Sequence, residues 1–161
     1  MSRFLSVNGV TKGQTALTVT AGAYSDGDVV GGLIRFDYDS SIGGAVINQV
    51  AIFDDDNQSA VFDLYLFHTE PQTIADNAAF ASALTFASLS KLIVPKKAIS
   101  TYTTINSNNY AFADFDKAFI SSPTAGINTI WAYLVLNGST PTYSATSGTL
   151  LVRIDLLTEG R

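Results

Sequence analysis

The stretch that decides the fold is Ala45–His68, which reads AVINQVAIF (45–53), then DDDNQS (54–59), then AVFDLYLFH (60–68). The first run is rich in Val and Ile and the second in Phe, Leu and Tyr, residues that favour a pleated, half-buried surface. The connector contains Asp and Asn, which hydrogen-bond to their own backbone and tolerate turn geometry. The pattern therefore predicts an antiparallel β-hairpin.

The second run is apolar on nearly both faces of the expected strand. Successive side chains of a strand point to opposite faces, so each face can be written down from the sequence. The two faces consist of Phe62, Leu64 and Leu66, and of Val61, Asp63, Tyr65 and Phe67. Such a strand lies in the middle of a sheet, under a second layer or at a subunit contact.

The composition is that of a lightly charged globular chain. Its 161 residues suit one domain with a sizeable core. Hydrophobic residues make up 47%, whereas charged residues make up 14%, against roughly 25% in an ordinary soluble domain. A surface rich in Ser, Thr, Asn and Gly is common in proteins that assemble, and also in secreted β-proteins. The net charge of −5 disfavours a nucleic-acid partner, because binding phosphates requires clustered Lys and Arg.

Several classes of site and location are excluded by what the sequence lacks. The chain has no cysteine, which excludes disulfides, thiolate metal sites and a Cys nucleophile. The stretch MSRFLSVNGVTKG at the start lacks the apolar segment of a signal peptide. No apolar run approaches the roughly 20 residues of a membrane helix. We therefore expect a soluble protein with no membrane partner and no classical export signal.

Strand patterns and turn signals alternate along the rest of the chain. Gly31-Gly32 predicts a bulge or a close approach of the backbone. Residues 73–89 have helical spacing with Asp76 as an N-cap candidate, so a short helix is expected there. Further strands are expected at 14–20, 29–38, 91–94, 98–104, 110–113, 117–120, 127–136 and 149–157, with an exposed hairpin loop at 137–148.

Together these patterns predict an all-β fold. We expect a single-domain β-sandwich or jelly roll of about eight or nine strands with one short helical connection. The sandwich is expected to span residues 14–161. Residues 1–13 are expected to form an N-terminal arm, which either frays or docks on a neighbouring subunit.

The sequence offers no recognisable catalytic residue. His68 is the single histidine, and a His-based triad needs a nucleophile within reach and an orienting acid. The G-x-S-x-G, HExxH, Walker A and GxGxxG motifs are absent. Paired catalytic carboxylates are disfavoured because the two glutamates are Glu70 and Glu159 and the aspartates lie mostly in turns. We therefore expect a protein that is not an enzyme and that has no cofactor.

Two kinds of binding site stay open. The acidic turns Asp54-Asp55-Asp56-Asn57 and Asp26-Gly27-Asp28 are either solvated turns or calcium ligands, although neither fits an EF-hand loop. A set of aromatic residues is either a carbohydrate platform or part of the core or a subunit interface. These aromatic residues are Tyr102, Tyr110, Phe112, Phe115 and Tyr143.

Five stretches that are spread along the chain carry a family resemblance. They are AYSDGDVVGGLIRF (23–36), VFDLYLF (61–67), ADNAAF (75–80), SLSKLIV (88–94) and TPTYSATSGTLLVRIDLL (140–157). In their order and number they resemble a family of small virion structural proteins of tailed bacteriophages. They consist of strand and turn residues, so the resemblance supplies no catalytic residue.

The resemblance implies a head decoration, or cement, protein. Such a protein is a β-sandwich on the outside of a capsid, commonly a dimer or trimer, and its partner is the major capsid protein. Its location would be the phage head surface, and the host cytoplasm during assembly. The alternative is a tail or fibre module that binds a host glycan or receptor, with an aromatic platform near Tyr110 or Tyr143.

Overall fold

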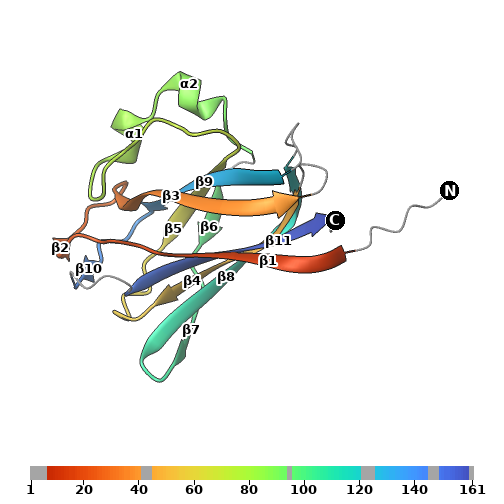
Figure 1. Cartoon of the computed structure of the whole chain (residues 1–161). Coiled ribbons are helices and arrows are strands. Elements are labelled where there is room, and N and C mark those ends of the chain that lie inside the picture. Colours follow the sequence, from red (N-terminus) through yellow and green to blue (C-terminus); the bar gives the residue numbers. More distant parts are fainter. Residues whose placement is uncertain (1–6, 41–44, 94–95, 121–125, 145–148, 160–161) are drawn as a thin grey trace.

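The computed structural model describes residues 7–40, 45–93, 96–120, 126–144 and 149–159. It is a β-sandwich of two antiparallel sheets, which confirms the expected fold class (Figure 1). The described residues contain eleven strands and two one-turn helices, where about eight or nine strands and one helix were expected.

The strands form two large sheets and one small one. The five-stranded sheet has the order β1 (Val7–Ala16), β11 (Leu150–Glu159), β4 (Ala45–Asp54), β8 (Asn108–Ile120) and β7 (Tyr102–Ile105). The four-stranded sheet has the order β3 (Val29–Ser40), β9 (Gly126–Leu136), β5 (Phe62–Phe67) and β6 (Lys97–Ile99). The pair β2 (Gly22–Ala23) and β10 (Thr142–Tyr143) and the helices α1 (Phe80–Ala83) and α2 (Phe86–Leu89) complete the fold.

The main hydrophobic core fills the space between the two large sheets. Its members include Ile47, Val50 and Ile52 of β4, Phe62, Leu64 and Leu66 of β5, Ile130 and Leu134 of β9, and Leu150, Val152, Ile154 and Leu156 of β11. Burying one such side chain stabilises the fold by about 1.5–3 kcal/mol. The apolar face predicted for Phe62, Leu64 and Leu66 is therefore confirmed.

The predicted hairpin within residues 45–68 is wrong, although both of its strands exist. β4 pairs with β11 and β8, whereas β5 pairs with β9 and β6, so the two strands belong to different sheets. The connector is therefore an arch between the sheets. The Oδ2 atom of Asp54 fixes it by accepting hydrogen bonds from the N–H groups of Gln58 (2.8 Å) and Ser59 (2.9 Å). This arch carries the chain across the core, where the apolar faces of the two strands meet.

Other strand boundaries also differ from the prediction. The pattern at 98–104 is divided between β6 and β7, which lie in different sheets, and those at 110–113 and 117–120 merge into β8. The described residues of 91–94 contribute an isolated bridge in place of a strand. β1 begins at Val7 and crosses the expected boundary between the arm and the sandwich, and residues 1–6 lie outside the described residues.

The predicted hairpin loop at 137–148 is a connection between sheets, and that prediction is wrong. β9 and β11, which flank it, belong to different sheets. Its residues Thr142 and Tyr143 form β10, and Tyr143 is buried in the main core. Residues 145–148 of this loop lie outside the described residues.

The bulge predicted at Gly31-Gly32 is confirmed. The register between β3 and β9 shifts between Val30 and Ile34, and the two glycines have φ angles of 78° and 69°. A Cβ atom on Gly31 would lie 2.8 Å from the Cβ and Cδ1 atoms of Leu17. Gly31 is therefore required by both the left-handed backbone and the close approach.

Residues 68–93, which include α1 and α2, cover the outer face of the four-stranded sheet (Figure 1). They enclose a second core that contains Val29, Phe67, Ile74, Phe80, Tyr133 and Val135. Phe67 and Tyr65 of β5 pack into it, so the second face of this strand lies under a second layer, one of the three positions that its sequence predicted. No helix among the described residues has the length and apolarity needed to cross a membrane.

Asp76 is not a helix cap, so that prediction is wrong. α1 begins after Ala79, which caps it without a side-chain hydrogen bond. The Oδ2 atom of Asp76 accepts hydrogen bonds from the N–H (2.7 Å) and hydroxyl (2.6 Å) of Thr20 and from the hydroxyl of Tyr24 (2.7 Å). Its Oδ1 atom accepts one from the N–H of Gly31 (2.6 Å). This carboxylate therefore fastens the outer layer to the strands beneath it.

Candidate functional site

The acidic turn places its three carboxylates in different surroundings. Asp54 is 1% exposed, and burial raises the pKa of its carboxyl group. Asp56 accepts hydrogen bonds from the N–H (2.7 Å) and hydroxyl (2.8 Å) of Ser144, whereas Asp55 is exposed. The described residues contain no group of three or more His, Asp or Glu side chains with the geometry of a metal site.

The second acidic turn also uses its carboxylates to fix the backbone. Asp26 accepts a hydrogen bond from the N–H of Gly138 (2.7 Å), and Asp28 accepts one from the N–H of Ser25 (2.7 Å).

His68 is exposed, and its Nδ1 atom lies 2.8 Å from the hydroxyl of Thr69.

The five aromatic candidates are divided between the core and the surface. Tyr143 and Phe115 are buried, and Tyr102 packs against the core and donates a hydrogen bond to the carbonyl of Ala60 (2.7 Å). Tyr110 and Phe112 lie on the outer face of the five-stranded sheet, with ring centroids 5.5 Å apart. The structure thus brings together two of the five.

Phe53 and Arg153 join Tyr110 and Phe112 on this outer face. The ring of Phe53 lies 6.3 Å from that of Phe112, and the Arg153 guanidinium lies over both rings at 5.3 and 5.9 Å. Cross-strand register aligns Leu151, Phe53 and Tyr110 in one row across β11, β4 and β8. Phe53 and Arg153 were missed because the sequence does not state which strands are neighbours.

A cavity of about 380 Å³ lies at one end of this row. Its walls come from the end of β4, the β7–β8 turn, the start of β8 and the start of β11. The lining residues are Phe53, Asp54, Asp55, Ile105, Asn106, Asn108, Asn109, Tyr110, Thr149 and Leu151. The cavity therefore combines aromatic and aliphatic walls with carboxylate, amide and hydroxyl groups.

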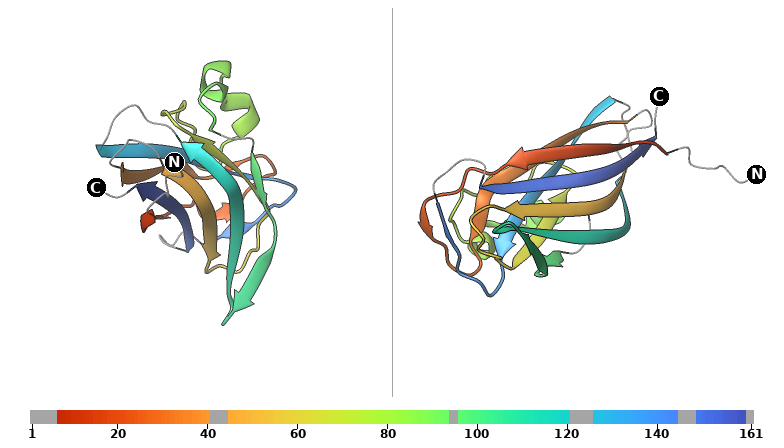
Figure 2. Two further views of the ribbon diagram at one scale, coloured as in Figure 1. Left: turned by 90° about the vertical axis from the view of Figure 1, so that its right-hand side faces the viewer. Right: turned by 90° about the horizontal axis from the view of Figure 1, so that it is seen from below.

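A second surface feature is an apolar tip on α2. Phe86 is 85% exposed and Leu89 is 43% exposed. Residues 77–90, which contain both helices, carry no charged side chain. α2 and the β7–β8 hairpin lie on opposite sides of the molecule (Figures 1 and 2). The apolar tip, defined as Phe86 and Leu89, is thus remote from the cavity.

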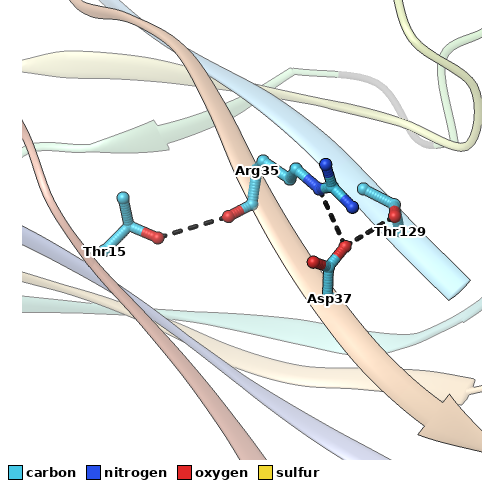
Figure 3. Close-up of polar contacts among 4 residues, drawn as sticks. All are labelled: Thr15, Arg35, Asp37 and Thr129. Atoms are coloured by element: carbon cyan, nitrogen blue, oxygen red, sulfur yellow. Dashed lines mark hydrogen bonds and ion pairs between the residues drawn. The ribbon is translucent and has the colours of Figure 1, made fainter. Parts of the chain in front are cut away.

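A polar cluster on β3 and β9 is satisfied by its own members. Asp37 accepts hydrogen bonds from the Thr129 hydroxyl (2.6 Å) and the Nε atom of Arg35 (2.9 Å), and these contacts lower the pKa of its carboxyl group (Figure 3). The guanidinium of Arg35 also lies 5.6 Å from the centre of the Trp131 ring. The Thr15 hydroxyl donates to the carbonyl of Arg35 (3.2 Å), which connects β1 of one sheet to β3 of the other.

Comparison with known proteins gives weak likenesses. No protein-family model and no curated protein matches the sequence. A chain of the structure of infectious bursal disease virus, Gx strain, aligns with a TM-score of 0.28 and 9% identity over 96% of this chain and 36% of that chain. A chain of the VP2 subviral particle of the same virus aligns with a TM-score of 0.21 and 11% identity over 94% and 41%. TM-scores this low establish neither a shared fold nor a shared function.

Proposed function

We propose that the protein is a structural component of a virion, a head decoration protein that docks on the major capsid protein through its apolar tip. The class of protein is supported by the five sequence stretches that resemble small virion proteins of tailed bacteriophages. The observation that carries the docking surface is the 85% exposure of Phe86 on a tip without charged residues.

Phe86 has the properties of an interface anchor. Aromatic side chains are enriched in the buried centres of interfaces, where charged residues are depleted. The helix that presents Phe86 is fixed before binding, because the Ser88 hydroxyl accepts a hydrogen bond from the N–H of Gln72 (2.9 Å) and the Thr85 hydroxyl caps α2. A fixed anchor loses little conformational entropy when it binds.

The stabilising effect on a shell follows from mass action. A protein that binds the assembled shell more tightly than its free subunits shifts the equilibrium towards the shell. In this role the protein is a homo-oligomer, a dimer or trimer, without enzymatic turnover and without a nucleic-acid or membrane partner. Its location is the head surface, and the host cytoplasm during assembly.

The first test is the position of the protein on particles. Antibody and gold label on intact virions from its source is expected to spread evenly over the head. Label at the tail tip would contradict the decoration proposal and favour the tail or fibre module. Particles without any label would contradict a virion role altogether.

The second test is the exchange of Phe86 for serine, measured by co-sedimentation with undecorated shells. Burying a Phe side chain contributes about 1.5–3 kcal/mol, so Phe86→Ser is expected to weaken binding roughly 10- to 150-fold. The matched control is Ile105→Ser, which removes an apolar side chain that is 54% exposed on the opposite side of the molecule. Equal binding by both variants and the unchanged protein would refute docking through the apolar tip.

A further inference from the structure

We propose that the cavity at the ends of β4, β8 and β11 binds a neutral sugar residue of a glycan. The proposal rests on the residues that line the cavity, and it does not depend on docking through the apolar tip. α2, which carries the tip, and the β7–β8 turn, which lines the cavity, lie on opposite sides of the molecule (Figures 1 and 2), so one copy can use both at once.

The apolar wall suits the C–H face of a sugar ring. Leu151, Phe53 and Tyr110 are direct neighbours in one cross-strand row, and Ile105 of the β7–β8 turn adds to them. Small-molecule sites combine such apolar and aromatic walls with a few polar groups that fix the orientation of the ligand. A flat aromatic side chain beside aliphatic neighbours provides a stacking surface, which selects a ring-shaped ligand with one apolar face.

Three polar side chains of the wall are available to bind hydroxyl groups. Among the described residues, the side chains of Asp55, Asn106 and Asn108 are exposed and make no hydrogen bond with protein atoms. Each Asn side chain offers donors and an acceptor, and the Asp55 carboxylate offers acceptors, which together match hydroxyls that both donate and accept. The Asn109 amide is excluded from this role because its partners are Thr104 (2.6 Å) and Ser59 (2.6 Å).

The charge of the cavity selects a neutral ligand. Two carboxylates, Asp54 and Asp55, line it, and no lysine or arginine occurs among its described lining residues. The whole chain carries a net charge of −5, which adds repulsion of anions. Phosphorylated, sulfated and sialylated glycans are therefore disfavoured relative to neutral ones.

The walls are held in place without a ligand. Asn106 and Ser107 have φ angles of 50° and 69°, the left-handed pair required by a tight type I′ hairpin turn between Ile105 and Asn108. On the other side, the N–H of Asp55 donates a hydrogen bond to the carbonyl of Thr149 (2.8 Å). The cavity of about 380 Å³ lies near the lower end of the roughly 300–1,000 Å³ range of ligand pockets, which suits a single sugar residue.

The test is a panel of immobilised glucose, galactose, mannose and N-acetylglucosamine, each with a phosphorylated or sialylated counterpart. We expect binding to at least one neutral sugar, a loss of roughly tenfold or more for Tyr110→Ala, and retention for Tyr110→Phe, which keeps the ring. Asn108→Ala changes an exposed side chain and provides a second weakened variant if Tyr110→Ala does not fold.

Phe86→Ser separates this proposal from the docking proposal. It is expected to bind the neutral sugars like the unchanged protein while losing affinity for shells. The sugar site would be overturned if the protein bound none of the neutral sugars, if it bound acidic sugars alone, or if Tyr110→Ala and Asn108→Ala both bound as tightly as the unchanged protein. None of these outcomes changes the expectation for shells.

Discussion

At the scale of single residues, Gly31 is the position where a substitution is expected to be least tolerated. An alanine there would adopt φ near 78° and place its Cβ atom 2.8 Å from Leu17. The left-handed backbone costs about 1–2 kcal/mol, and overpacking adds about 1–3 kcal/mol. We therefore expect the free energy of unfolding of Gly31→Ala, measured by urea titration, to be lower than that of the unchanged protein by the sum of these two costs.

Gly27→Ala is the matched control for the contact with Leu17. Gly27 has a φ angle of 84°, but a Cβ atom there would meet nothing within 4 Å. This variant is therefore expected to lose only the backbone contribution of about 1–2 kcal/mol. Equal losses for the two alanine variants would show that the approach of Leu17 has no energetic effect.

The glycines and the aspartates differ in how much of their role the sequence reveals. Gly31-Gly32 within a strand pattern predicts a bulge, because a glycine pair has a local conformational meaning. Asp76 looks like a helix cap locally, yet its partners are Thr20, Tyr24 and Gly31, which lie 45 to 56 residues away. A carboxylate whose hydrogen bonds are all long-range cannot be assigned from its neighbours in sequence.

At the scale of elements, the outer layer of residues 68–93 depends on the carboxylate of Asp76. Asp76→Ala removes the acceptor of four hydrogen bonds from Thr20, Tyr24 and Gly31. Hydrogen bonds to a charged group are worth about 1.5–3 kcal/mol each, and several donors here stay in contact with water, so a total loss of about 2–4 kcal/mol is expected. Urea unfolding measures the loss, and hydrogen exchange is expected to accelerate in residues 74–93.

Asp55→Ala is the control for this change, because Asp55 is exposed and makes no side-chain hydrogen bond among the described residues. A surface change of this kind stays within about 0.5 kcal/mol. If Asp76→Ala and Asp55→Ala unfold at the same urea concentration, Asp76 does not fasten the outer layer.

Element types were more predictable than element partners. The Val, Ile, Phe, Leu and Tyr content of β4 and β5 correctly identified both as strands. The apolar face of β5 was also predicted, because successive side chains of a strand point to opposite faces. Their pairing was predicted wrongly, since a polar connector looks alike in a hairpin and in an arch between sheets. Likewise, Tyr110 and Phe112 were among five aromatic residues left open between a carbohydrate platform and the core or an interface, and Phe53 joins them only through the register of β4 with β8.

At the scale of the whole molecule, one core shared by both sheets predicts a single unfolding transition. Trp131, the one tryptophan of the chain, lies on β9 and packs against the second core under residues 68–93. Its fluorescence and the far-UV circular dichroism of the sheets are expected to change together on heating, as in a two-state transition. A fluorescence change at lower temperature would show that the outer layer melts separately.

The pairing of β1 with β11 also has a consequence for synthesis on the ribosome. β11 lies between β1 and β4 and hydrogen-bonds to both, although about 95 residues separate the end of β4 from its start. Neither strand can take its final place in the sheet until β11 has left the exit tunnel. The edge of β4 that pairs with β11 therefore stays unpaired until β11 emerges, and during this time aggregation competes with folding. Emergence of β11, and not of the first strands, sets the start of native folding of this sheet.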